Sequence, residues 1–252
     1  MNLAQIDIDP LQSASAHDVL RWAIETFGDR FAVSTSFQRE GMVILDIAAR
    51  MSSWVRVFTL DTGRLPRETY DIIETVRARY GIHVELVSPD ASEIEAMVTR
   101  FGPNLFYESL PFRNLCCHFR KVRPLDRKLA GLDAWAVGLR RSQAASREET
   151  SKIEQVGEKF KLSPLADWSP EQVGEYIEEF DVPQHPLYAK GYTSIGCEPC
   201  TRATSAGEHE RAGRWWWETE GSKECGIHFT PEGRVERTLD VLVREILNSS
   251  NA

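Results

Sequence analysis

The chain has 252 residues, a formal net charge of −8 at pH 7, 42% hydrophobic residues and 27% charged residues, which suits one sizeable domain or one domain with a small appendage. The acidic balance argues against non-specific binding of nucleic acid, because such binding needs a basic surface. No run of about 18 apolar residues is present, so we expect no membrane span.

The first ten residues lack the basic start and the apolar core of a secretory signal. We therefore expect a cytoplasmic protein whose thiols are kept reduced. In that compartment, clustered cysteines are more typical of metal ligands or catalytic groups than of structural disulfides.

A helix, a strand and a second helix are expected early in the chain. Apolar residues at helical spacing predict a helix over residues 16–26, and a short apolar run predicts a strand over 31–33. The small polar residues of Ser34–Gly41 predict a loop, which leads into a helix over 42–50. A strand, a polar loop and a helix in this order can present backbone N–H groups to an anion. An ordinary turn is the alternative interpretation of the loop.

The alternation of strands and helices continues to about residue 180. It predicts strands over 55–60, 83–87 and 134–137, and helices over 66–80, 90–101, 116–129 and 169–180. This order indicates an α/β fold with an open, mostly parallel sheet and helices on both faces. Ligands of such sheets bind beyond the carboxyl ends of the strands, so the loops after Val33, Leu60 and Val137 form the expected site.

The small polar loops Ser34–Gly41 and Asp61–Leu65 together favour a nucleotide site. Neither G-x-x-x-x-G-K-[ST] nor G-x-G-x-x-G occurs, so a Walker-type NTPase or a nicotinamide enzyme is not supported. From about residue 185 the alternation stops. We therefore expect a nucleotide-binding α/β domain over residues 1–184 and a loop-rich C-terminal segment over 185–252.

Four of the five cysteines form two close pairs, Cys116–Cys117 and Cys197–Cys200. A set of four thiolates suits zinc or an iron–sulfur cluster. Adjacent cysteines are awkward ligands for one tetrahedral zinc ion, since neighbouring side chains on a helix diverge by about 100°. The spacing therefore favours an iron–sulfur cluster, with zinc, a redox disulfide and plain buried thiols as the alternatives.

Basic residues recur at positions expected to face a ligand. Lys121 follows Cys117 by four residues on the same helical face, where it could offset cluster charge and link the cluster to the substrate. Arginines gather after the strand over 134–137 and after the second cysteine pair: Arg140, Arg141, Arg147, Arg211 and Arg214. Guanidinium groups suit recognition of phosphate or sulfate, although a solvated surface is the usual alternative for such a run.

The fifth cysteine, Cys225, lies in a polar segment beside Gly226 and three residues before His228. A thiolate is the best protein nucleophile for sulfur chemistry, and a glycine-containing segment can swing onto a substrate. We therefore interpret Cys225 as the catalytic nucleophile, against the alternative of a bystander surface thiol.

Six stretches taken together resemble the assimilatory adenylyl-sulfate reductases of the phosphoadenylyl/adenylyl-sulfate reductase family, over most of the chain. They are Ser34–Phe37, Leu60–Leu65, Cys116–Leu125, Gly138–Gln143, Gly196–Thr201 and Glu224–His228. The resemblance implies a Rossmann-like fold of the adenine nucleotide alpha-hydrolase type, followed by a mobile catalytic tail.

The resemblance also implies a role for each motif. Cys225 would attack the sulfur of adenylyl sulfate with AMP leaving, and thioredoxin or a similar dithiol would release sulfite from the enzyme S-sulfocysteine. A 4Fe–4S cluster would be held by Cys116, Cys117, Cys197 and Cys200. The expected substrate-binding residues are Ser34, Ser36, Leu60, Thr62, Lys121, Arg140, Arg147, Arg211, Arg214 and His228.

Other functions stay open at this point. Family members that use the 3′-phosphorylated substrate typically lack the cluster cysteines, so these cysteines favour adenylyl sulfate, with dual use as an alternative. An adenylating enzyme of the same fold is disfavoured by the missing S-G-G-x-D-S loop. A non-enzymatic iron–sulfur sensor would make Cys225 dispensable. The sequence also leaves a homo-oligomer open.

Overall fold

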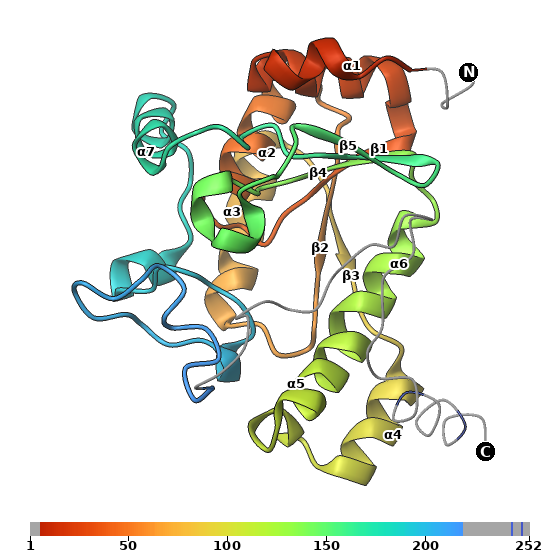
Figure 1. Ribbon diagram of the computed structural model, residues 1–252, viewed down its shortest axis with the longest axis vertical. Helices are drawn as coiled ribbons and strands as arrows, with labels where there is room; N and C mark the ends of the chain where they lie inside the picture. The colour runs from red at the N-terminus through yellow and green to blue at the C-terminus, as the bar shows by residue number, and fades with distance from the viewer. Residues whose placement is uncertain (1–5, 219–242, 244–247, 249–252) are drawn as a thin grey trace.

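The computed structural model describes residues 6–218, 243 and 248, and its centre is one six-stranded sheet (Figure 1). The strand order is β3-β2-β1-β4-β6-β5, with every neighbouring pair parallel except β5 with β6. The strands are β1 (Phe31–Ser34), β2 (Arg56–Leu60), β3 (Val84–Val87), β4 (Ala134–Val137), β5 (Ile153–Val156) and β6 (Lys159–Leu162). The predicted open, mostly parallel sheet is confirmed.

Helices alternate with the strands, as predicted. They are α1 (Ala16–Phe27), α2 (Arg39–Met51), α3 (Arg67–Tyr80), α4 (Ala91–Phe101), α5 (Leu110–Cys117), α6 (Arg123–Leu129) and α7 (Pro170–Glu179). Ser169 and Gln172 cap α7 reciprocally through side chain and backbone. At α4 only half of such a box forms, because Asp90 caps the helix while the Glu93 carboxylate pairs with Arg123 of α6.

Successive strand residues pack on opposite faces of the sheet, since side chains alternate along a strand. Phe31 and Val33 of β1 belong to the large core, to which α1, α2, α3 and α7 contribute. Ala32 instead joins a smaller cluster with Leu125 and Leu129 of α6. Helices therefore cover both faces of the sheet.

The β5–β6 hairpin adds two strands beyond those predicted. In β5 only the terminal residues Ile153 and Val156 are buried. In β6 the buried Phe160 and Leu162 alternate with two partly exposed lysines. Gly157 turns the chain between them with φ 62, a conformation that glycine adopts without steric cost. Two buried positions per strand are too few to distinguish a strand from a loop in the sequence.

The C-terminal part of the described chain is loop-rich. It contains two short 3₁₀ turns, Pro186–Lys190 and Glu198–Cys200, and an isolated antiparallel bridge between Thr201 and Arg214. The bridge folds the chain back, so that Arg214 lies beside the second cysteine pair. Among the residues that the structure describes, no helix is both long and apolar enough to cross a membrane.

Candidate active site

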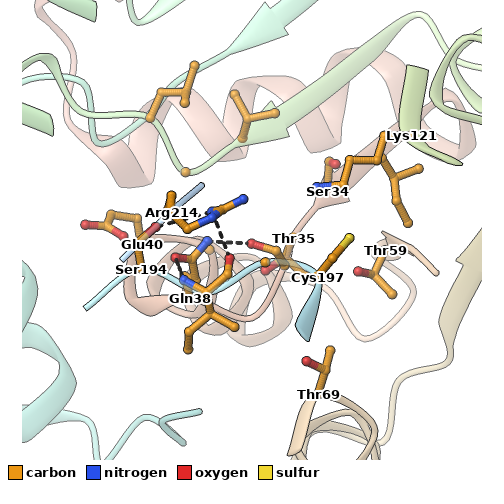
Figure 2. Close-up of a pocket in the computed structure, with 18 of the residues that line it drawn as sticks. Ser34, Thr35, Gln38, Glu40, Thr59, Thr69, Lys121, Ser194, Cys197 and Arg214 are labelled. Atoms are coloured by element: carbon orange, nitrogen blue, oxygen red, sulfur yellow. Dashed lines mark hydrogen bonds between the residues drawn. The ribbon is translucent and has the colours of Figure 1, made fainter. Parts of the chain in front are cut away.

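A cavity of about 310 Å³ lies at the carboxyl edge of the sheet (Figure 2). Because β1, β2 and β4 are parallel, their last residues Ser34, Leu60 and Val137 meet at one edge, and all three line the cavity. The lining includes most of the predicted substrate-binding residues: Ser34, Ser36, Leu60, Thr62, Lys121, Arg147, Arg211 and Arg214.

The loop between β1 and α2 directs the helix N-terminus at the cavity. Phe37 is buried in the left-handed region (φ 58), which non-glycine residues rarely adopt, and its N–H donates to Thr35 Oγ1 at 2.9 Å. The Gln38 side chain does not cap α2, because its Oε1 accepts from the Ile195 N–H at 2.8 Å. Gly41 of the first turn lines the cavity. The positive end of the helix dipole therefore favours an anion there.

The loop after β4 packs directly on the first turn of α2. A methyl group on Gly138 would lie 2.8 Å from the Gly41 nitrogen and 3.0 Å from Glu40 Cβ, so this approach requires glycine. Arg140 is 3% exposed, and it donates to Glu40 at 2.8 Å and to Ser142 Oγ at 2.7 Å. Arg140, predicted to contact the substrate, is not among the described residues that line this cavity, and its ion pair with Glu40 holds the two loops together.

Four cationic side chains lie around the cavity: Lys121, Arg147, Arg211 and Arg214. Arg214 is 4% exposed, and its Nη1 donates to Ser194 Oγ at 3.3 Å and to the Ile195 carbonyl at 3.2 Å. Its buried Nε has no hydrogen-bond partner among the described residues. A buried guanidinium that lines the cavity and has donor capacity left is well suited to bind phosphate or sulfate.

The two cysteine pairs line a second, narrow cavity beside the first. Its thiols are free and between 6% and 8% exposed: Cys116, Cys117, Cys197 and Cys200. Burial raises the pKa of the Cys116 thiol and raises the pKa of Cys200 to about 12, because a buried thiolate loses its hydration. Cys197 and Lys121 line both cavities, and Thr62 Oγ1 lies 3.3 Å from Cys197 Sγ. The two cavities therefore share a wall.

Positive charge gathers around the cysteine cavity. Besides the thiols, it is lined by Arg64, Phe106, Arg113, Arg120, Lys121, Pro199 and Trp215. Arg113 and Trp215 are stacked, with the guanidinium carbon 4.4 Å from the ring centroid. In the described ranges, no group of three or more His, Cys, Asp or Glu side chains is arranged to hold one metal ion. The four thiols thus surround a cationic cavity instead of meeting at one point.

A π-helical turn, His118–Val122, joins α5 to α6. The helix predicted over 116–129 therefore begins earlier, at Leu110, and is not α-helical throughout; in Figure 1, α5 and α6 lie along one line. Within the turn, Arg120 Nη1 donates to the Thr62 carbonyl at 2.7 Å, and the next residue, Lys121, reaches both cavities. Such turns recur at functional sites.

Several cavity residues were not predicted, among them Thr59, Thr69, Ser194 and Glu210. Thr59 belongs to β2, next to the predicted Leu60. Thr69 of α3, and Ser194 and Glu210 of the C-terminal segment, reach the cavity through tertiary packing that no local sequence motif indicates. Burial, with Glu40 nearby, raises the pKa of the Glu210 carboxyl. Two predicted residues, Cys225 and His228, lie outside the described residues.

Sequence comparison finds relatives along most of the chain. The pattern of the phosphoadenosine phosphosulfate reductase domain matches residues 30–203. Adenosine 5′-phosphosulfate reductase of Allochromatium vinosum is 44% identical over 224 residues, which cover 88% of this chain and 87% of that protein. The chloroplastic 5′-adenylylsulfate reductase 3 of Arabidopsis thaliana is 42% identical over 229 residues, which cover 86% of this chain and 49% of that protein.

Two solved structures have a fold similar to that of this chain. Phosphoadenylyl-sulfate reductase from Candida auris, in a phosphate complex, has a TM-score of 0.66 at 32% identity, covering 80% of this chain and 99% of that chain. FMN adenylyltransferase of Candida glabrata has a TM-score of 0.52 at 14% identity, covering 98% of this chain and 84% of that chain. The second likeness concerns the fold alone.

Proposed function

The chain belongs to the phosphoadenosine phosphosulfate reductase domain family, and we propose that it reduces adenylyl sulfate to sulfite and AMP in assimilatory sulfate reduction. The observation that carries this proposal is the set of side chains that line one cavity. Neutral strand-end residues and four cationic side chains line it together, and it shares a wall with four buried cysteines. This combination suits a nucleotide whose phosphate bears a second anionic group.

We assign the parts of the substrate to the cavity by matching their charge to that of the lining residues. The neutral strand-end residues would hold the nucleoside: Ser34, Ser36, Leu60 and Thr62. The phosphosulfate would lie against the cations: Lys121, Arg147, Arg211 and Arg214. A thiolate that attacks an anionic phosphosulfate meets electrostatic repulsion, and preorganised cations reduce it while they stabilise the departing phosphate.

Cys225 is the nucleophile of the proposed reaction. Its thiolate forms a bond to the sulfur of the sulfate group, the bond from that sulfur to the bridging oxygen breaks, and AMP leaves with the electron pair. The product on the enzyme is an S-sulfocysteine. Three residues further on, His228 is proposed to contact the substrate as well.

A dithiol reductant, thioredoxin or a similar protein, completes the cycle. One of its thiolates attacks Cys225 Sγ, sulfite leaves, and the second thiol then resolves the mixed disulfide. The dithiol is oxidised to a disulfide and supplies both electrons. A reductant of this kind, and a Cys225 that must return to the thiol, fit a reducing compartment such as the cytoplasm.

We further propose that the four buried cysteines hold a 4Fe–4S cluster. The four thiols surround one cavity, and four basic side chains there would offset the negative charge of thiolate ligands. The cluster would supply an electrostatic influence on the adjoining substrate cavity through Lys121, since the electrons come from the dithiol. Residues 1–184 would then form the nucleotide-binding domain, and residues 185–252 would bring Cys197, Cys200 and Cys225 to it.

An assay of sulfite release tests the proposal. Iron-loaded protein with thioredoxin is supplied with adenylyl sulfate or with phosphoadenylyl sulfate, and kcat/KM is compared. We expect turnover of adenylyl sulfate and a lower kcat/KM for the 3′-phosphorylated compound. If neither compound yields sulfite, the chain is not a reductase of this kind. A higher kcat/KM for phosphoadenylyl sulfate would reverse the assignment of the substrate.

Gly196 offers a test of Arg214. A methyl group at Gly196 would lie 2.4 Å from Arg214 Nη2 and 2.6 Å from its Cζ, so the guanidinium would have to move. Gly196→Ala is therefore expected to raise the KM for adenylyl sulfate about tenfold or more, because a charge-assisted contact is lost. Steady-state kinetics measure the effect. The matched control is Gly174→Ala on α7, where an added methyl group meets nothing within 4 Å; an equal KM in both variants would exclude Arg214 from substrate binding.

A further inference from the structure

Thr69 and His185 form a buried pair at the nucleotide cavity that the proposed reaction does not use. Thr69 belongs to α3, is 3% exposed and lines the cavity. His185 is 1% exposed and precedes the 3₁₀ turn Pro186–Lys190. Thr69 Oγ1 lies 3.0 Å from His185 Nε2. A histidine that is hydrogen-bonded to a cavity hydroxyl can determine whether that hydroxyl donates or accepts a hydrogen bond towards a ligand.

The position of the histidine proton follows from its two contacts. The Leu187 N–H donates to His185 Nδ1 at 3.3 Å, so Nδ1 is the unprotonated nitrogen. Burial lowers the pKa of His185 to about 4, so the ring is neutral near neutral pH. The single ring proton is therefore on Nε2, which donates to Thr69 Oγ1.

The Thr69 hydroxyl then has its own proton left to donate. Its only hydrogen bond within the described part of the chain is the one to His185. Figure 2 shows Thr69 apart from Lys121 and Arg214, two of the four cations assigned to the phosphosulfate. The apolar side chains of Leu60 and Leu65 line the same cavity. The remaining proton therefore faces the space assigned to the uncharged part of the ligand.

We propose that Thr69, held by His185, donates a hydrogen bond to an uncharged acceptor on the nucleoside of the substrate and contributes to its recognition. Thr69 touches the ligand, and His185 acts as the positioning residue that makes this hydroxyl a donor. The acceptor is a ring nitrogen of the base or an oxygen of the ribose. The inference rests on the proposed function, since it needs an adenine nucleotide in this cavity.

Calorimetric binding of AMP to the full iron-loaded chain tests the pair. Thr69→Val keeps the shape of the side chain and removes the hydroxyl, and it is expected to weaken AMP binding about fivefold to thirtyfold. Thr69→Ser restores the hydroxyl and is expected to bind like wild type. His185→Gln keeps a donor near the Nε2 position and is expected to lose less affinity than His185→Phe, which removes the donor.

Analogues of AMP distinguish recognition from a structural effect. Each lacks one acceptor: the 1-deaza, 3-deaza and 7-deaza compounds and the 2′-deoxy and 3′-deoxy compounds. We expect one of them to bind equally to wild type and Thr69→Val, since it lacks the contacted atom. The same penalty with every analogue, or unchanged AMP affinity in Thr69→Val, would overturn the inference. Failure of the wild type to bind AMP would instead overturn the proposed function.

Discussion

Cys225→Ser is expected to abolish sulfite release from adenylyl sulfate, with a rate at least about 1,000-fold below wild type. An alcohol is far less acidic than a thiol, so almost no alkoxide exists near neutral pH. A serine oxygen also cannot form the sulfur–sulfur bond on which the dithiol acts. The measurement is sulfite formed per minute at saturating adenylyl sulfate and thioredoxin.

A single-turnover experiment without reductant tests the role of Cys225 in a second way. Wild-type protein mixed with adenylyl sulfate alone is expected to release up to one AMP per chain and to retain the sulfonate on Cys225, whereas Cys225→Ser releases none. The variant should keep its iron content and its affinity for AMP, which shows that the fold and the nucleotide site survive. Full turnover by Cys225→Ser would remove this residue from the mechanism, and wild-type inactivity with an intact cluster would favour a sensor.

The elements predicted most accurately are those whose pattern is long enough to be read locally. Helix α1 was expected over 16–26 and spans Ala16–Phe27. The prediction was accurate because six buried residues recur at helical spacing along one face of this helix. The β5–β6 hairpin was not expected, since two short strands with only two buried residues each resemble a loop in the sequence. The order of strands in the sheet depends on contacts far apart in sequence, and only the general rules for parallel sheets anticipate it.

In the site, too, local sequence patterns predicted some features, while others depend on tertiary packing. Loops after β1, β2 and β4 were expected to meet, and Ser34, Leu60 and Val137 do line one cavity. The position of Arg140 was not foreseen, because its pairing with Glu40 depends on how closely two glycine-containing segments approach. A charged side chain in a strand-end loop can face either the ligand or the protein, and only tertiary packing decides which.

Lys121 shows how a local irregularity places a predicted residue. Four residues after Cys117 on a regular α-helix, its side chain would lie on the same face as the cysteine. The π-helical turn His118–Val122 changes this register, and Lys121 lines both the cysteine cavity and the nucleotide cavity. The spacing therefore predicted that Lys121 lies near the cysteines, while the π-helical turn determines that it lines both cavities.

Cys200→Ala is expected to remove the proposed cluster, lowering iron from about four atoms per chain towards zero together with its visible absorption. Alanine supplies no ligand atom, whereas serine could replace the thiolate with an oxygen. Cys200 is buried among basic side chains, so the loss of a thiolate ligand also leaves positive charge less compensated. Metal binding contributes to folding stability, and the variant should therefore unfold at a lower temperature than wild type.

The matched control for Cys200→Ala is Cys225→Ala, which removes the one cysteine that the proposal keeps outside the cluster. The two variants should separate the functions: Cys225→Ala retains iron and loses turnover, while Cys200→Ala loses both. Iron and acid-labile sulfide are measured on anaerobically purified protein. One zinc ion per chain with no iron would favour a mononuclear site, and unchanged iron in Cys200→Ala would remove this thiol from the ligand set. Equal iron loss in both variants would contradict the division of the five cysteines into four ligands and one nucleophile.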